Sequence, residues 1–556
     1  YEMQRSLVGS EMCIRDRGGP EGQSWSVWCH PTSNWTYGEV RSDNAYKGGG
    51  GVGDLNEVHR METFDMDATN GFLDSKWYHL YCSVQRCNSA LRVLNAATDE
   101  QVNGRVSRIA EMKVLRAHYY FELSRLFNKI PYFDENVEIS QYPDIPNNEF
   151  TRDEILSMLA KEMLDAAEQL PASQPEVGRI HKYIALAYAA KIKLYQAYQQ
   201  DETTHAVTSI NKELLREVVS LCDQVTASNR YGLLDDFQGL DLVTNENGKE
   251  SVFAIQYSMN DGTESAGRIN WSNLLNSPGG GSPYGGDGFF LPSQDLINAY
   301  QTDANGLPDF NYQSKSDYSW AVLNNGVYTL QNTTPNVDPR LDFVVGRPTI
   351  TWKTYPDKPC EGWVRDKDTY GYNCAKRFWV SPESSDMFNG WPWGASQLNW
   401  QIIRYADILL WKAEALIELN EGDGLETARD LINQIRNRAR NSAYVKDFND
   451  HSKYAANYLV NPYPADVWNQ DYARQALRWE TRLEKALEGE RFFDLVRWGI
   501  VETTMNKYIT AESDNRIYYA NAHFTGGKDE YYPVPNNQYG FSGGKYVQNP
   551  GYAPFN

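Results

Sequence analysis

The segment RWETRLEKALEGERFFD, residues 478–494, carries acidic and basic side chains at a spacing that is relevant to catalysis. Glu480, Glu484 and Glu488 recur every fourth residue, which places them on one face of a helix, and Asp494 lies just beyond them. Two carboxyl groups at a suitable separation are the catalytic pair of glycoside hydrolases, so a glycoside-processing enzyme is one hypothesis. The basic residues interleaved with these carboxylates are Arg478, Arg482, Arg491 and Arg497. Alternating charges at this spacing are typical of a salt-bridged helix surface, and we favour that interpretation over an active site.

Other patterns give little support to catalysis. The sequence contains no GxSxG and no HExxH motif, and His118 lies in a helix with two apolar faces, as expected of a core histidine. The glycine runs at 48–53 and 279–288 follow no strand and precede no GK[ST], so neither predicts a phosphate-binding loop. Asp43 and Asp54 flank the first run, but they lack the ligand order of an EF-hand, and we favour a surface loop. We expect neither a metal ion nor a cofactor.

Aromatic residues are abundant, with 16 Trp and 37 Tyr, and many lie in stretches rich in Gly, Pro and Asn. A protein that binds sugars without cleaving them needs flat aromatic faces for the pyranose rings and polar groups for the hydroxyls. The candidate stacking residues are Tyr46, Phe64, Trp271, Tyr284, Trp320, Trp363 and Trp391. The candidate polar neighbours are Asn44, Arg268 and Asn273. For each aromatic residue taken singly, packing within its own loop is the alternative interpretation.

The composition favours a folded protein without affinity for nucleic acid. The chain has 556 residues, 41% of them hydrophobic, which is enough for a sizeable core in one large domain or in two to three ordinary domains. Its 53 basic and 73 acidic residues give a net charge of −20, which repels phosphate backbones. No run of about 18 apolar residues predicts a membrane span. Seven cysteines form no CxxC pair, and Cys360 and Cys374 either form a disulfide or remain thiols.

Helical periodicity is densest in QIIRYADILLWKAEALI, residues 401–417, where apolar or small residues recur at intervals of three and four. The other segments with helical spacing are 72–97, 105–127, 151–170, 179–199, 211–228, 425–440, 471–488 and 490–498. Thr151 and Glu154 form a capping box. ESVFAIQYS, residues 250–258, alternates like a short strand. Pairs of helices about the size of tetratricopeptide units predict a mainly α fold of helical-hairpin repeats.

The periodicity divides the chain into four parts. Residues 1–17 fit nothing that follows: SLVGSEMCIRDR resembles the translated read-through of a sequencing adapter, and we expect the natural N-terminus to be missing. Residues 18–230 form an N-terminal helical-repeat part, whose aromatic and glycine-rich stretch 25–53 predicts an irregular surface segment. Residues 231–400 form a large loop-rich insertion with a few short strands. Residues 401–556 form a C-terminal helical-repeat part and an extended tail.

Eight motifs carry a family resemblance, and they cover nearly the whole chain after about residue 25. They are EMKVLRAHYYFELSRLFNKIPYF (111–133), GRIHKYIALAYAAKIKLY (178–195), ESVFAIQYS, FFLPSQDLINAY (289–300), DPRLDF (338–343), IIRYADILLWKAEAL, LEGERFFDLVRWG (487–499), and YYPVPNNQ with QNPGY. Together and in this order they resemble the SusD/RagB family, the glycan-binding outer-membrane lipoproteins of Bacteroidetes. The ordered set is far more specific than any one motif.

The resemblance implies a non-catalytic protein on the extracellular face of the outer membrane. It implies a glycan ligand, bound by the loop-rich insertion, and a TonB-dependent SusC-like transporter over which the protein sits as a lid. It also implies a lipid anchor on an N-terminal cysteine; Cys29 has no apolar run before it and makes a poor attachment site. The alternatives are the glycoside-processing enzyme and a tetratricopeptide-type protein-interaction scaffold. The excess of aromatic residues in the insertion argues against a bare scaffold.

Overall fold

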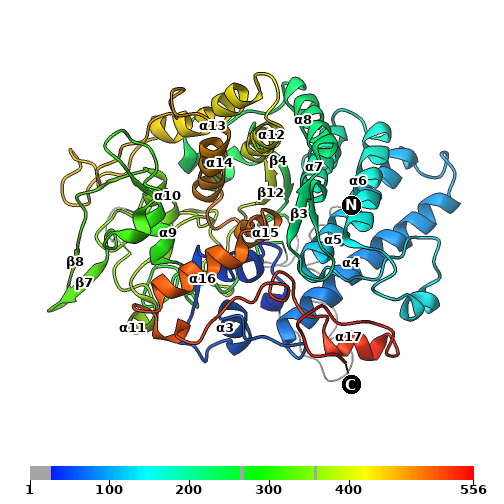
Figure 1. Ribbon diagram of the computed structural model, residues 1–556, viewed down its shortest axis with the longest axis horizontal. Coiled ribbons are helices and arrows are strands. Elements are labelled where there is room, and N and C mark those ends of the chain that lie inside the picture. The colour runs from blue at the N-terminus through cyan, green and yellow to red at the C-terminus, as the bar shows by residue number, and fades with distance from the viewer. Residues whose placement is uncertain (1–26, 263–267, 356–359, 556) are drawn as a thin grey trace.

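The computed structural model describes residues 27–555 apart from 263–267 and 356–359. An arc of helices forms the upper and right-hand parts of the molecule in Figure 1, and loops with short helices and strands fill the lower and left-hand parts. Most buried hydrophobic side chains of both parts belong to one continuous core. The predicted fold class, a mainly α protein with a loop-rich region on a helical scaffold, is confirmed.

The scaffold is a series of helical hairpins, as predicted. Its helices are α4 (Gly71–Ala96), α5 (Arg105–Phe127), α6 (Arg152–Gln169), α7 (Lys182–Ala197), α8 (Lys212–Ala227), α12 (Tyr405–Leu419), α13 (Gly424–Asn441) and α14 (Gln470–Glu484). From α4 to α8 each helix packs against the next along the chain. Helix α8 then packs against α12, although residues 228–404 separate them in the sequence.

Local sequence signals set the ends of these helices. The capping box is confirmed, because the Thr151 hydroxyl accepts a hydrogen bond from the Glu154 amide and the Glu154 carboxylate accepts one from the Thr151 amide. Asparagine side chains cap the starts of α4, α8 and α14. The side chains of α5 are buried on all sides from Val114 to Phe127, so this helix lies inside the repeat.

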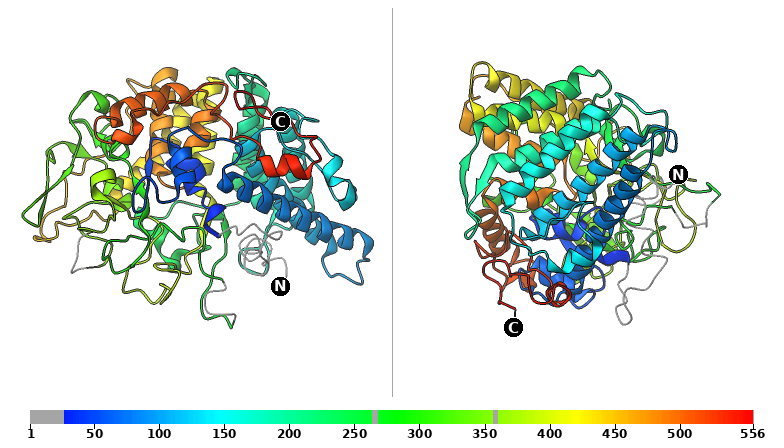
Figure 2. Two further views of the ribbon diagram at one scale, coloured as in Figure 1. Left: turned by 90° about the horizontal axis from the view of Figure 1, so that it is seen from below. Right: turned by 90° about the vertical axis from the view of Figure 1, so that its right-hand side faces the viewer.

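Two short strands connect the loop-rich region to the helical scaffold. Strand β4 (Ser251–Ile255) pairs antiparallel with β12 (Trp400–Arg404), which leads directly into α12. The prediction that this helix starts at residue 401 is wrong, because Ile403 is buried by pairing with Phe253 and the helix begins only after Arg404. The other strand pairs are β1 (Ala45–Gly48) with β5 (Phe289–Pro292), β2 (Tyr198–Gln200) with β3 (Val207–Ile210), β6 (Gln301–Thr302) with β9 (Asn336–Val337), β7 (Ala321–Asn324) with β8 (Val327–Leu330), and β10 (Val345–Gly346) with β11 (Cys374–Ala375). Figure 2 shows the green loops extending beyond the helices on one side of the molecule.

The stretch 30–48 lies at the centre of the molecule, so its prediction as a surface segment is wrong. It contains a π-helix (Trp35–Val40) and strand β1, and it packs against α3 (Asn56–Glu62) and α15 (Arg491–Arg497). Without a helical period its burial leaves no pattern in the sequence. Its charged side chains are tolerated inside because each has a partner, as described below. The remaining α-helices of the described chain are α9 (Gln294–Ala299), α10 (Arg340–Val344), α11 (Lys367–Tyr370), α16 (Val501–Glu512) and α17 (Asn536–Phe541).

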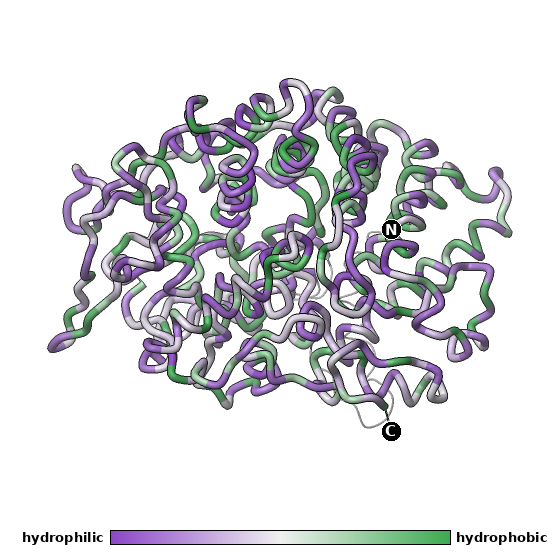
Figure 3. Tube along the Cα trace, viewed as in Figure 1, coloured by the Kyte–Doolittle hydropathy of each residue, from purple (hydrophilic) through white to green (hydrophobic). Residues whose placement is uncertain are grey.

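The structure also bears on the membrane and on the cysteines. Hydrophobic and hydrophilic residues alternate along the trace in Figure 3, and within the described part of the chain no helix is long and apolar enough to cross a membrane.

Cys360 and Cys374 are both buried free thiols. Burial raises the pKa of Cys374 to about 12, and burial next to Cys374 raises that of Cys360 as well. Both thiols are therefore protonated at neutral pH.

Candidate functional site

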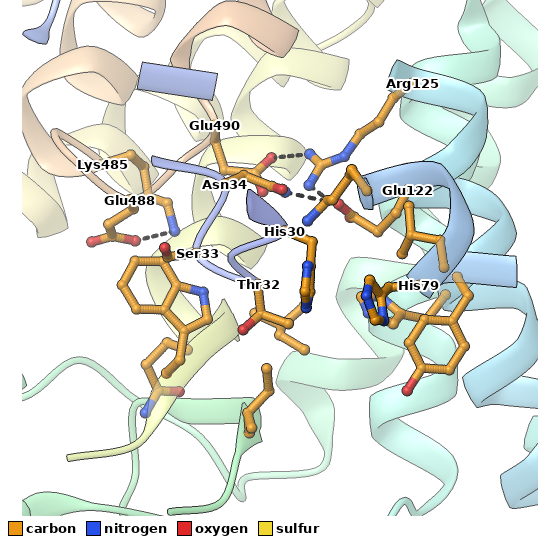
Figure 4. Close-up of a pocket in the computed structure, with 18 residues that line it drawn as sticks. His30, Thr32, Ser33, Asn34, His79, Glu122, Arg125, Lys485, Glu488 and Glu490 are labelled. Atoms are coloured by element: carbon orange, nitrogen blue, oxygen red, sulfur yellow. Dashed lines mark hydrogen bonds and ion pairs between the residues drawn. The ribbon is translucent and has the colours of Figure 1, made fainter. Parts of the chain in front are cut away.

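A cavity opens between residues 30–34, helices α4 and α5, strand β12 and the loop 485–490 (Figure 4). We call it the central cavity. Its volume is about 50 Å³, measured as the space open to the centre of a water molecule, which is room for several waters or hydroxyl groups. Its lining mixes imidazole, amide and charged groups with Trp400, Ile255 and Leu80, so it can contact both polar and apolar parts of a ligand.

Two glycines bring the walls of the central cavity together. A Cβ atom on Gly38 would lie 1.9 Å from the carbonyl oxygen of Gly489, and one on Gly489 would lie 2.0 Å from that of Ser33. Gly489 also has a φ of +83°, which favours glycine. The buried Glu39 carboxylate accepts hydrogen bonds from the Gly489 amide at 2.9 Å and the Glu490 amide at 3.3 Å. The π-helix and the loop 485–490 are thus joined backbone to backbone.

We expect Gly38→Ala to destabilise the fold by about 3 kcal/mol or more, because the new methyl group has no space unless the backbone moves. The measurement is the midpoint of denaturant unfolding. Gly71→Ala is the control, since a Cβ there meets nothing within 4 Å and the residue lies at the start of α4. Equal unfolding midpoints for Gly38→Ala and the wild type would contradict this account of the cavity wall.

The histidines of the central cavity are uncharged at neutral pH. The rings of His30 and His79 stack with centroids 3.7 Å apart (Figure 4). Burial, with Lys76 close by, lowers the pKa of His79 to about 4, and burial lowers that of His118 to about 4. Burial with His79 and Lys76 nearby also lowers the pKa of His30. The Nε2 atom of His30 is buried without a hydrogen-bond partner among the described residues, so it remains available to a water or a ligand hydroxyl.

The carboxylates of the central cavity are ionised and paired with cations. Burial alone would raise the pKa of Glu122, but Arg125 and other cations lower it to about 2. Glu490 contacts Arg125 at 2.7 Å, and Glu488 contacts Lys485 at 2.5 Å. A glycosidase needs one carboxyl group that stays protonated to act as the general acid. These carboxylates do not supply one, so the cavity fits binding better than bond cleavage.

Three tryptophans on loops form an aromatic surface, which we call the tryptophan surface: the half-buried Trp271 and the exposed Trp391 and Trp393. The ring centroids of Trp271 and Trp391 lie 5.6 Å apart at an interplanar angle of 66°. Trp391 is 54% exposed and Trp393 is 47% exposed. Exposed side chains of the size of Trp391 and Trp393 are available to a flat ligand.

Hydrogen bonds fix the two loops that carry the tryptophan surface. The side-chain amide of Asn270 donates to the Leu398 carbonyl at 2.9 Å. The backbone N–H of Asn270 donates to the Ser396 carbonyl at 2.8 Å. The Ser277 hydroxyl donates to the Trp393 carbonyl at 2.8 Å. The Ser33 hydroxyl, in the wall of the central cavity, donates to the Ser272 carbonyl at 2.7 Å. The loop that carries Trp271 is therefore bonded to the wall of the central cavity.

The structure brings together two of the seven aromatic residues predicted to stack on sugars, Trp271 and Trp391. Four others are core residues: Tyr46, Phe64, Tyr284 and Trp363 are each at most 4% exposed. Their use as stacking residues is withdrawn, because a ring that other side chains cover cannot present a face to a ligand. The loop-rich region has an aromatic core of its own, in which Trp352 lies 5.0 Å from Trp363 and donates a hydrogen bond to Tyr284.

The remaining candidates are divided between the core and the surface. Asn44 is buried and joins Glu39 to Arg482, so its prediction as a sugar ligand is wrong. Asn273 is buried as well, although its Nδ2 atom has no partner among the described residues. Arg268 is partly exposed and contacts Asp261 at 2.8 Å. Trp320 is 39% exposed on a separate hairpin, at the start of β7.

The carboxylates of residues 478–494 form a buried ion cluster, so the predicted salt-bridged surface is wrong. Glu480 and Glu484 are completely buried, and Glu488 is 6% exposed. Their arginine partners come from other elements and not from the same helix. They are Arg340 and Arg436 for Glu480, Arg340, Arg404 and Arg438 for Glu484, and Arg377 and Arg404 for Glu488. Because each of these carboxylates is paired with arginines in a buried cluster, these residues serve the fold and not a reaction.

The glycine loop at 48–53 is organised by a lysine. The Lys47 ammonium donates to the carbonyls of Gly48 at 3.0 Å and Gly51 at 2.8 Å, and also to that of Asp54. Burial, partly offset by Glu62 and Asp54, lowers its pKa to about 8. Asp43 points elsewhere, because its carboxylate binds Arg491 and Arg482. Asp43 and Asp54 therefore do not converge on a common site.

Sequence reasoning missed part of this site. Trp393 was not a candidate, although the sequence GWPWG places it two residues after Trp391 in a stretch without helical period. His30 and Asn34 lie in the segment predicted to be irregular surface, and no signal marked them. Their position depends on contacts with α4, α5 and the loop 485–490, which are distant in the sequence.

The architecture and the site define a class: a helical-hairpin scaffold that presents an exposed aromatic surface on inserted loops. Comparison with known proteins identifies the family. A family profile described as "SusD family" matches residues 249–552, and one described as "Starch-binding associating with outer membrane" matches residues 32–194. The first match covers more than half of this chain, and the chain therefore belongs to the SusD family.

Individual relatives agree with this assignment. A "SusD-like protein" of Bacteroides ovatus is 22% identical over 457 residues, 78% of this chain and 67% of its own. "SusD-like protein P2" of Formosa agariphila is 24% identical over 498 residues, 88% of this chain and 83% of its own. Among solved structures, a SusD superfamily protein of Bacteroides vulgatus superposes with a TM-score of 0.69 at 20% identity, covering 99% of this chain and 98% of that one. A surface glycan-binding protein A of Bacteroides thetaiotaomicron, in complex with laminarihexaose, superposes with a TM-score of 0.64 at 18% identity. The superposition covers 99% of each chain.

Proposed function

We propose that this protein binds a polysaccharide or oligosaccharide without cleaving it. The tryptophan surface is the observation that carries the proposal, because Trp391 and Trp393 are exposed, Trp271 packs against Trp391, and the loop of Trp271 is bonded to the wall of a polar cavity. Pyranose rings stack on such faces, and their hydroxyls need the amide and imidazole groups that the cavity provides. The matched family description names starch binding, and one structural neighbour is described with laminarihexaose bound, which supports the same class of ligand.

We further propose that the protein acts at the outer membrane as part of an uptake system. It would be lipid-anchored on the extracellular face and deliver the bound glycan to a TonB-dependent SusC-like transporter. Membership of the SusD family and the family description "associating with outer membrane" support this proposal. Co-purification of the protein with such a transporter from detergent-solubilised outer membranes is the test, and its absence from those fractions would count against delivery.

Affinity electrophoresis tests the binding function directly. The purified protein is run through gels that contain laminarin, starch, xylan, alginate or mucin-type glycans, and reducing-end release is assayed in the same samples. We expect retardation by one class of polysaccharide without release of reducing ends. Release that persists in a purified sample would instead support the glycoside-processing enzyme. Failure of every glycan to retard the protein would favour the protein-interaction scaffold.

A further inference from the structure

The loops that carry the tryptophan surface are poor in basic residues. Residues 257–288 and 381–400, which contain the three tryptophans, have one basic residue, Arg268. The same two stretches have five acidic residues: Asp261, Glu264, Asp287, Glu383 and Asp386. The whole chain adds to this bias with its net charge of −20. A ligand that carries negative charge is therefore repelled as it approaches these loops.

Two arginines contact these loops, and each already has an acidic partner. Arg268 contacts Asp261 at 2.8 Å. Arg365, from a neighbouring loop, donates to the backbone carbonyl of Asp287 at 2.8 Å and contacts the carboxylate of Asp54 at 3.3 Å. A carboxylate or sulfate group on a sugar ring would have to displace these partners before it could bind either guanidinium group. Neither arginine is thus prepared for an acidic ligand.

The carboxylate of Asp386 lies at the base of the loop that carries Trp391 and Trp393. A β-bridge between Met387 and Ser396 closes this loop, and Asp386 immediately precedes it. The carboxylate accepts hydrogen bonds from the side-chain amide of Gln397 at 2.7 Å and from the Ser384 hydroxyl at 3.2 Å. Both donors are uncharged, so these hydrogen bonds do not neutralise the carboxylate. It would repel an acidic group that is bound at this loop.

The central cavity offers no surplus of positive charge either. The charged residues that line it in the described chain are three cations and three carboxylates: Lys76, Arg125 and Lys485 with Glu122, Glu488 and Glu490. Arg125 contacts Glu490 at 2.7 Å, and Lys485 contacts Glu488 at 2.5 Å. Since the histidines of the cavity are uncharged at neutral pH, a further negative charge in the cavity would have no counter-charge of its own.

Asn34 gives the wall of the central cavity a hydrogen-bond acceptor (Figure 4). Its Nδ2 atom donates to the Glu122 carboxylate at 2.8 Å, which fixes the orientation of the side-chain amide. Its Oδ1 atom is buried without a hydrogen-bond partner among the described residues. A sugar hydroxyl has a hydrogen to donate to this oxygen, whereas an ionised carboxylate or sulfate group has none.

We propose that the glycan is neutral, a polymer of uncharged sugars, and that polysaccharides rich in uronic acids or sulfate groups are excluded. The paired arginines, the Asp386 carboxylate and the balanced charges of the central cavity all disfavour an acidic ligand. Because this proposal rests on the proposed glycan binding, it narrows the class of ligand for the same site. Of the polysaccharides named above, it allows laminarin and starch and excludes alginate.

The test compares derivatives of the same polysaccharide by titration calorimetry with the whole protein. The probes are laminarin, starch and galactomannan, each also as its carboxymethyl derivative and as its hydroxyethyl derivative with an equal degree of substitution. The carboxymethyl group adds a negative charge, and the hydroxyethyl group adds similar bulk without charge. At about 0.01 M salt, where screening is weak, we expect at least one neutral polysaccharide to bind. Its carboxymethyl form should bind about tenfold more weakly than its hydroxyethyl form, or weaker still.

The possible results separate this proposal from glycan binding itself. Equal affinity of the carboxymethyl and hydroxyethyl forms would overturn neutral selectivity and leave the proposed glycan binding intact. Binding of alginate or polygalacturonate in preference to every neutral polysaccharide would have the same meaning, and loss of that binding in Arg268→Gln would identify the cation responsible. Failure of every polysaccharide, neutral or acidic, to bind would overturn both proposals together.

Discussion

Trp391→Ala is expected to weaken retention by the cognate polysaccharide roughly thirtyfold while leaving the melting temperature unchanged. An exposed tryptophan that anchors a ligand contributes about 2 kcal/mol or more, which corresponds to that factor. Because Trp391 is 54% exposed, its loss creates no cavity in the core, and surface changes of this kind alter stability by about 0.5 kcal/mol or less. The measurement is the dissociation constant from affinity electrophoresis over a range of polysaccharide concentrations, together with a thermal unfolding curve.

Trp320→Ala is the matched comparison for this experiment. Trp320 is also an exposed tryptophan, at 39%, but it stands on the β7–β8 hairpin and not in the tryptophan surface. We expect Trp320→Ala to bind like the wild type and the double variant Trp391→Ala, Trp393→Ala to lose retention completely. Loss of binding in Trp320→Ala, with normal binding in the double variant, would move the site to the hairpin.

Glu484→Gln is expected to destabilise the fold by about 3–5 kcal/mol at neutral pH, because it removes one charge from a closed ion cluster. Glu484 contacts Arg404 at 2.7 Å and Arg340 at 3.0 Å and also pairs with Arg438, and it is completely buried. Three guanidinium groups would then lack a shared counter-charge. Denaturant unfolding measures the change. Glu213→Gln is the control, since its exposed pair with Arg216 contributes about 1 kcal/mol or less.

The same substitution should change the pH dependence of stability. Burial alone would raise the pKa of Glu484, but Arg438, Arg404 and Arg340 lower it to about 2, below the value of about 4.3 for an unfolded chain. A carboxylate with a lowered pKa stabilises the fold above the unfolded-state pKa, and its contribution is lost as the pH falls toward 2. Glu484→Gln should therefore show a flatter loss of stability between pH 5 and pH 2, where these limits follow from the two pKa values. An identical slope in both proteins would show that Glu484 is not ionised in the fold.

Much of the helical scaffold could be predicted from the sequence because each helix contains its own signals. Apolar spacing located α4 to α8 and α12 to α14, and the Thr151 capping box fixed the start of α6. The error at residue 401 shows the limit of such signals. Residues 401–404 continue the apolar pattern of the helix, and only the pairing of Ile403 with Phe253 makes this stretch a strand. Pairing with a distant partner leaves no mark in the local pattern.

The candidate site could be predicted only in part, because the exposure of an aromatic ring depends on the rest of the fold. Tyr284 and Trp391 both lie in Gly- and Pro-containing loops, yet the first is 3% exposed and the second 54%. The prediction that the charged residues of 478–494 lie on a helix surface was wrong for a related reason. Periodicity showed that Glu480 and Glu484 share a face, but the arginines that allow this face to be buried lie in α10, β12 and α13 or beside them.

The buried leading segment, residues 30–48, constrains the order in which the parts of this protein fold. The Arg41 guanidinium donates to the carbonyl of Asp529 at 2.6 Å, and the Tyr532 hydroxyl donates to the carbonyl of Tyr37 at 3.1 Å. These partners are separated by nearly the whole chain, so we expect the local helices to form before this segment contacts its final neighbours. A prematurely terminated chain would leave this aromatic segment exposed to solvent and to other chains. The leading segment is therefore among the last parts of the described chain to reach its final position.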